Sequence, residues 1–131
     1  MVNFFSKYKI VFYSINFFLI FLYLFPGSLL GYIIYNDIST QPQITLNFII
    51  SSNHFYAFVL IAFVGFLTFI KLEQNKYLII YLISLSIILE LFHLIIPARS
   101  FQWSDLFGNL FGVIIVILIN HFIKKYEFFK K

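Results

Sequence analysis

Between residues 90 and 112, this apolar chain gathers side chains that could bind a polar ligand or exchange protons with it. Glu90 and His93 are three residues apart, Arg99 follows them, and Asp105 and Asn109 are four residues apart. A carboxylate and an imidazole can act as acid and base. A guanidinium can hold a carboxylate or a phosphate through two hydrogen bonds. This run is therefore the candidate functional segment.

The same segment offers possible metal ligands. His54, Glu90, His93 and Asp105 carry donor atoms that zinc accepts. The Glu90-x-x-His93 element resembles one found in the metal sites of helical bundles, but those sites need a second such element and further glutamates. The chain has no second element, and the charge of Arg99 would oppose a cation. We therefore expect no metal and no cofactor.

The composition indicates that lipid surrounds most of the surface of the protein. Hydrophobic residues make up 62% of the 131 residues and charged residues only 11%, whereas soluble domains carry about 25% charged residues. The mean hydropathy is +0.96. Because the chain contains 0 cysteines, it has neither disulfides nor thiolate chemistry. The sequence predicts an integral membrane protein.

Four apolar segments are each near the roughly 20 residues that a helix needs to cross the hydrocarbon core. They lie at residues 10–25, 54–70, 77–96 and 105–123. Their apolar runs are too long and too continuous for the strands of a membrane barrel. We therefore predict an all-α membrane protein, a bundle of four transmembrane helices in a single domain covering residues 1–131. The first helix is expected to be uncleaved, because no cleavage-site pattern lies near Gly27.

The lysines predict the orientation of this bundle. They lie before the first segment, between the second and the third, and after the fourth: Lys7, Lys9, Lys71, Lys76, Lys124, Lys125, Lys130 and Lys131. Because positive residues favour the cytoplasmic side, both termini are expected in the cytoplasm, and residues 27–53 form an external loop. The net charge of +4 is thus a topology signal, and we expect no nucleic-acid partner.

With this topology, the polar residues converge on one layer at the outer side of the membrane. Glu90 lies about 9 Å below the outer end of the third helix, at a rise of about 1.5 Å per residue. His93 is almost one turn further along the same face. Asp105 and Asn109 lie in the first part of the fourth helix, and His54 opens the second. A carboxylate at such a depth usually faces a partner or a wet cavity.

Structural explanations compete with a functional site. Arg99 could form an ion pair with Glu90 or Asp105 that fixes the loop between the last two helices. Asp105 could instead cap the fourth helix. Gly108 and Gly112 have the small-xxx-small spacing typical of helix packing, and they also offer one surface for a homodimer. These readings stay open at the level of the sequence.

The run from Glu90 to Gly112 resembles the signature of VanZ-like membrane proteins. That family typically has a Glu, a Gln three residues later, an Arg, and then an Asp, an Asn and a Gly spaced into the next helix. The corresponding residues here are Glu90, His93, Arg99, Asp105, Asn109 and Gly112. His54-Phe55 resembles the family's His-Phe, so the resemblance covers about residues 51–119. His93 departs from the usual Gln and adds a titratable group.

The resemblance implies a multi-pass protein of the bacterial cytoplasmic membrane, linked to the cell envelope and to teicoplanin-type resistance, and it brings no cofactor or reaction. Our first hypothesis is a protein that binds or shields a membrane lipid or a lipid-like amphiphile at the outer leaflet. The candidate ligand-binding residues are His54, Glu90, His93, Arg99, Asp105 and Asn109. The second hypothesis is an intramembrane enzyme that acts on a lipid-linked substrate, with Glu90 or His93 as acid or base. The third is a structural or assembly protein.

Overall fold

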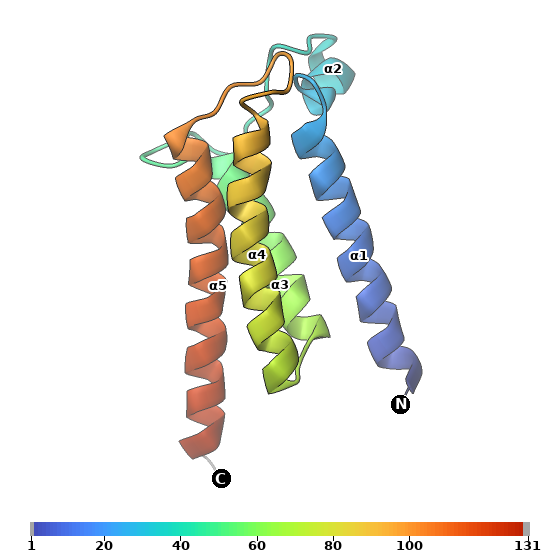
Figure 1. Cartoon of the computed structure of the whole chain (residues 1–131), viewed down its shortest axis with the longest axis vertical. Helices are drawn as coiled ribbons and strands as arrows, with labels where there is room; N and C mark the ends of the chain where they lie inside the picture. The colour runs from blue at the N-terminus through green and yellow to red at the C-terminus, as the bar shows by residue number, and fades with distance from the viewer. Residues whose placement is uncertain (1, 130–131) are drawn as a thin grey trace.

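Figure 1 shows the computed structural model of the chain, which describes residues 2–129 and, among their side chains, those of residues 8–71 and 73–126. Five α-helices and no strands occur within the described residues. The helices are α1 (Val2–Leu24), α2 (Leu29–Tyr35), α3 (Ser52–Thr68), α4 (Leu72–Phe92) and α5 (Trp103–Phe129). The prediction of an all-helical chain is confirmed for this range.

Two helices are long and apolar enough to cross a membrane: α4 over Glu73–Phe92 and α5 over Trp103–Tyr126. A third span results if α1 and α2, which meet at an angle of 82°, form one broken span. Helix α3 is a shorter apolar helix of 17 residues. The chain is thus a membrane protein with two or three candidate spans, and the arrangement with four spans stays a prediction.

The break between α1 and α2 occurs at the predicted Pro26-Gly27 pair. Gly27 has a φ of +83°, in the left-handed region that favours glycine, and a Cβ there would lie 2.9 Å from the carbonyl oxygen of Ile38. The hydroxyl of Ser28 then caps α2 by accepting the backbone N–H of Gly31 at 2.8 Å. Residues 27–53 therefore contain a short helix in addition to the expected loop.

Helix α4 ends four residues earlier than the predicted Ile96. The backbone N–H groups of His93 and Leu94 bond to carbonyls three residues back, so the last turn tightens into a non-helical turn. Pro97 reinforces this end, because the residue before a proline is disfavoured in a helix. Helix α5 in turn begins at Trp103 and extends past the predicted end at residue 123.

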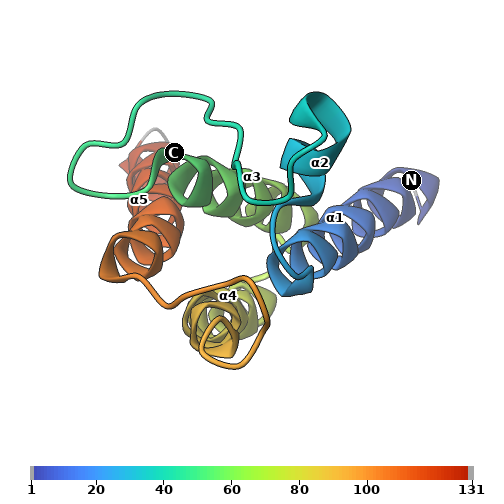
Figure 2. The same cartoon turned by 90° about the horizontal axis from the view of Figure 1, so that it is seen from above.

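The helices place all the long connections on one side. In Figure 1, α2 and the loops around residues 36–51 and 93–102 lie at one end of the bundle, and the N-terminal end of α1 and the C-terminal end of α5 lie at the other. Figure 2 shows α3 between α1 and α5, with α4 on the other side of the bundle from α2. The apolar core draws on all four long helices, through residues such as Phe12, Phe58, Leu82 and Val113.

Gly108 and Gly112 allow α5 to approach α3 closely. A Cβ at Gly108 would lie 2.8 Å from the carbonyl oxygen of Ser51, and one at Gly112 would lie 2.6 Å from that of Phe55. Small residues permit such contact between helix backbones. Helix α3 of the same chain thus packs against Gly108 and Gly112, and the homodimer stays a prediction.

Candidate functional site

The predicted polar residues from three helices meet at the end of the bundle that carries the long loops. His54 lies in the first turn of α3, Glu90 in the last turn of α4, and Asp105 and Asn109 in the first two turns of α5. His93 follows the end of α4 and faces the same volume, with its ring centroid 6.4 Å from that of His54. These five residues are brought together as the sequence led us to expect.

Tyr23, near the end of α1, connects this cluster to the first helix. Its hydroxyl donates to Asn109 Oδ1 at 2.7 Å and lies 3.0 Å from His54 Nδ1. Its backbone carbonyl accepts from His93 Nε2 at 3.1 Å. The sequence contains 9 tyrosines, and nothing in its pattern separates Tyr23 from the others except its position three residues before Pro26. We therefore missed this residue.

The hydrogen bonds determine which nitrogen of His54 carries the proton. The 2.7 Å distance between the oxygens of Tyr23 and Asn109 needs the phenolic hydrogen, so that hydrogen is not available to His54. His54 Nδ1 therefore carries a hydrogen, which it donates to the Tyr23 hydroxyl oxygen or to Asn109 Oδ1 at 3.1 Å. In the neutral ring, Nε2 then has a free lone pair, and it lies 3.4 Å from Asp105 Oδ2.

His93 repeats this pattern. Its Nε2 donates to the carbonyl of Tyr23, which can only accept, so Nδ1 of the neutral ring has a free lone pair. That nitrogen lies 3.2 Å from Glu90 Oε2. Two imidazole nitrogens thus face two carboxylate oxygens, and every one of these four atoms is an acceptor. A hydrogen on one partner of each pair, or a metal ion between the partners, would turn these contacts into attractive ones.

Glu90 is fully buried and only partly satisfied. Its Oε1 accepts the backbone N–H of Gln102 at 3.0 Å. Its Oε2 has no hydrogen-bond partner among the described residues, although His93 Nδ1 is near and His54 Nδ1 lies 3.9 Å away. Contact at 3.2 Å without hydrogen-bond geometry agrees with two facing acceptors. A buried carboxylate oxygen in this state is costly, which makes Glu90 the most unusual group of the site.

The predicted ion pair of Arg99 with Glu90 or Asp105 is wrong for this structure. Arg99 Nε donates to the carbonyl of Phe25 at 3.1 Å and Nη2 donates to that of Leu22 at 2.9 Å. No carboxylate of the described residues lies within 4.0 Å of its guanidinium. The last carbonyls of a helix lack intrahelical donors and attract a cation, so the end of α1 competes for Arg99. Burial lowers the pKa of Arg99 from its ordinary value, and nearby acidic groups oppose that shift.

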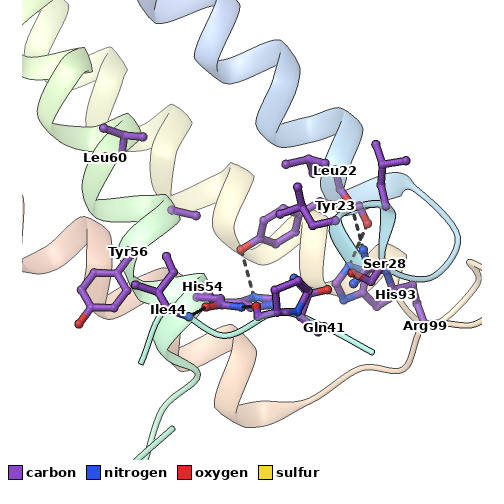
Figure 3. Close-up of a pocket in the computed structure, with 15 residues that line it drawn as sticks. Leu22, Tyr23, Ser28, Gln41, Ile44, His54, Tyr56, Leu60, His93 and Arg99 are labelled. Carbon is purple, nitrogen blue, oxygen red and sulfur yellow. Dashed lines mark hydrogen bonds between the residues drawn. The ribbon is translucent and has the colours of Figure 1, made fainter. Parts of the chain in front are cut away.

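A cavity of about 350 Å³ adjoins this cluster, between the end of α1, α2 and the first half of α3. Its polar side chains include Tyr23, His54, His93 and Arg99. Figure 3 shows the hydroxyl of Tyr23 directed toward His54, with Arg99 on the side of Leu22. Most of the other wall is apolar, formed by Leu22, Leu29, Leu30, Pro42, Ile44, Tyr56, Ala57 and Leu60. Leu30 and Leu60 are also exposed, so the apolar wall continues onto the outer surface of the bundle.

The chain matches no protein-family model, no characterised protein and no solved structure.

Proposed function

We propose that this chain is a VanZ-like protein of the bacterial cytoplasmic membrane that binds an amphiphilic cell-envelope ligand, a membrane lipid or a lipid-like molecule, at the outer leaflet. The observation that carries the proposal is the cavity beside the polar cluster, whose two kinds of wall match the two parts of an amphiphile. Three of the residues quoted above for the VanZ-like resemblance, His54, His93 and Arg99, line this cavity. Glu90, Asp105 and Asn109 lie next to His54 or His93.

The polar part of the ligand is placed against Arg99 and His54. A guanidinium has five N–H donors, and the contacts with Leu22 and Phe25 use only two of its nitrogens. The remaining donors are available to an anionic or carbonyl group. The volume of about 350 Å³ lies in the range of about 300–1,000 Å³ that is typical of ligand pockets.

The apolar part of the ligand is placed along Leu22, Ala57 and Leu60. Because Leu60 is 51% exposed on the outside of α3, an acyl chain can leave the cavity along the lipid-facing surface without crossing a polar barrier. A ligand with one polar end and one long apolar end is therefore favoured over a compact soluble molecule.

The orientation that we propose has four membrane-crossing helices, both termini in the cytoplasm and the cavity outside. In support, the free ends of α1 and α5 lie at the end of the bundle opposite to the cavity (Figure 1). Lys71 and Lys76, at the α3–α4 connection, belong to that same end. Helix α3 has 17 residues and a length of about 26 Å, close to the lower limit for a span.

The proposal is tested by filling the cavity. In a teicoplanin-susceptible bacterium, expression of the chain should raise the inhibitory concentration of teicoplanin. Ala57→Phe adds a ring to the cavity wall without touching the polar cluster, so it should abolish this protection while the protein remains at normal abundance in the membrane. The matched control is Leu67→Phe, which adds volume to an exposed position of α3 away from the cavity and should keep the protection.

Two results would contradict the proposal. One is full protection by Ala57→Phe, because the protein would then protect the cell although the new ring fills its cavity. The other is a loss of protection in both variants that is proportional to a loss of the protein from the membrane, measured by immunoblot. That result would assign the cavity region a purely structural role.

A further inference from the structure

We infer that His54, Glu90 and Asp105 form a binding site for one divalent metal ion of the zinc type. A donor atom from each of these three residues lies within 4.8 Å of a donor atom of the other two. The three residues come from α3, α4 and α5, so an ion held between them would join three helices. The inference goes beyond the amphiphile proposed above and does not depend on it, because metal content is measured without any lipid or drug.

The orientation of His54 is that of a metal ligand. Histidine ligands usually donate their second ring N–H to a fixed partner, which leaves the other nitrogen free to bind the metal. Here Nδ1–H is held by the Tyr23 hydroxyl and by Asn109 Oδ1. The amide of Asn109 is itself fixed, because its Nδ2 donates to the carbonyl of Ser86 at 3.2 Å. The free Nε2 is therefore directed at Asp105 by a network, and no rotation of the ring is needed.

Glu90 supplies an independent observation that points to a ligand. It is 0% exposed, and its Oε2 is the one buried side-chain oxygen or nitrogen without a hydrogen-bond partner among the described residues. Its other oxygen is oriented by the backbone N–H of Gln102 at 3.0 Å. Such support for one oxygen is what keeps a ligating carboxylate in place. The unpartnered oxygen lies 3.2 Å from His93 Nδ1 and 3.9 Å from His54 Nδ1. To share an ion with His54 Nε2 and Asp105, the Glu90 carboxylate would have to turn toward Nε2.

The distance between His54 Nε2 and Asp105 Oδ2 leaves room for a metal ion between them. Charge-assisted hydrogen bonds bring nitrogen and oxygen to about 2.7–2.9 Å. The facing acceptors here are further apart, at 3.4 Å for His54 Nε2 and Asp105 Oδ2 and at 3.2 Å for His93 Nδ1 and Glu90 Oε2. Two ligands bound to zinc at about 2.0–2.2 Å in tetrahedral geometry are about 3.3–3.6 Å apart. The separation of His54 Nε2 and Asp105 Oδ2 agrees with this spacing. The three donor atoms together lie within 4.8 Å of one another, so a bound ion would draw Glu90 closer to the other two.

The charge of the cluster suits a divalent ion. The sequence predicts no metal for two reasons: it has no second Glu-x-x-His element, and the charge of Arg99 would oppose a cation. The second reason is weakened, because the guanidinium of Arg99 donates to the end of α1. Glu90 and Asp105 then supply two negative charges that balance a divalent cation. Three protein ligands of nitrogen and oxygen type leave one position free, as in zinc sites that bind a further ligand. Of the three proposed ligands, His54 lines the cavity described above.

The test uses the full chain, purified in detergent and stripped of metal with a chelator. After incubation with zinc chloride and removal of free zinc, elemental analysis should find about one zinc per chain. His54→Ala, Glu90→Gln and Asp105→Asn should each lower the retained zinc. The expected weakening of zinc binding is at least about tenfold, the effect of losing an outer-shell partner. The matched controls are His121→Ala and Glu73→Gln, exposed residues outside the cluster, and both should retain the zinc of the unaltered protein.

Cobalt in place of zinc keeps the inference testable if the ligand variants lose helicity. The unaltered protein should then show the visible absorbance of tetrahedral cobalt with nitrogen and oxygen ligands, and zinc should displace it. The inference is overturned if the stripped protein retains no zinc and shows no such spectrum. It is equally overturned if folded Glu90→Gln keeps the full zinc content, or if His121→Ala loses as much zinc as His54→Ala, since the ion would then be bound adventitiously at the surface.

Discussion

Tyr23 and Asn109 form the contact through which α1 is joined to α5, and their replacement tests this part of the structure. Tyr23→Phe removes only the hydroxyl, which donates to Asn109 Oδ1 at 2.7 Å. Asn109→Ala removes the acceptor of Tyr23, the contact with His54 at 3.1 Å, and the donor to the carbonyl of Ser86 at 3.2 Å. Both residues are buried.

The two replacements should differ in magnitude. After Tyr23→Phe, His54 Nδ1 and Asn109 Oδ1 still bond to each other, so the loss is that of one hydrogen bond, about 1 kcal/mol. After Asn109→Ala, three polar contacts are lost and the carbonyl of Ser86 remains buried, which should cost about 2–3 kcal/mol. The double variant should be about 1 kcal/mol less destabilised than the sum of the two, because both single changes remove the same bond.

These free energies of unfolding can be measured by reversible denaturation with SDS in mixed micelles, followed by circular dichroism. Tyr13→Phe serves as the control, since Tyr13 is 58% exposed on α1 and its change should stay within about 0.5 kcal/mol. The reasoning is refuted if Asn109→Ala destabilises the protein no more than Tyr23→Phe does. It is also refuted if the effects of the two changes are additive, which would mean that the residues do not share a bond.

Two further predictions concern the packing and the orientation of the bundle. Gly112→Ala should destabilise the protein by about 1–3 kcal/mol in the same denaturation assay, because its Cβ would meet backbone of α3. Gly65→Ala should cost less, because its Cβ would meet only side-chain atoms, those of Leu78 and Phe12, and equal costs would contradict the close α3–α5 contact. A cysteine at Gln102 should react with a membrane-impermeant thiol reagent in intact spheroplasts and one at Gln74 should not, and labelling of the Gln74 variant would reverse the proposed topology.

The helices and the convergence of the polar residues could be predicted from the sequence, because both follow from spacing along the chain. Apolar runs and the Pro26-Gly27 pair mark where helices run and break. Residues near the ends of successive antiparallel helices must share a layer, which is why His54, Glu90 and Asn109 were assigned to one site before their contacts were known. Glu90 lies nearer to the end of its helix than predicted, because α4 ends at Phe92 and not at Ile96.

The partners within that layer could not be predicted in the same way. The sequence predicts a carboxylate partner for Arg99, because charged side chains can be read from it directly. The actual partners are backbone carbonyls at the end of α1, and no residue type marks them. Tyr23 was missed for a related reason, since its role depends on where α1 lies relative to α3 and α5. Long-range geometry decides both cases, and residue type alone does not contain it.

The same contacts determine what a ligand of the cavity must overcome. The C-terminal end of α1 is held by Arg99, by the bond from His93 to the carbonyl of Tyr23, and by the bond from Tyr23 to Asn109. A head group that takes all the donors of Arg99 would have to displace the carbonyls of α1, and these buried groups would then lack partners. A head group that accepts only the remaining donors leaves α1 in place. Tight binding therefore favours a ligand that adds to this network without replacing any of its bonds.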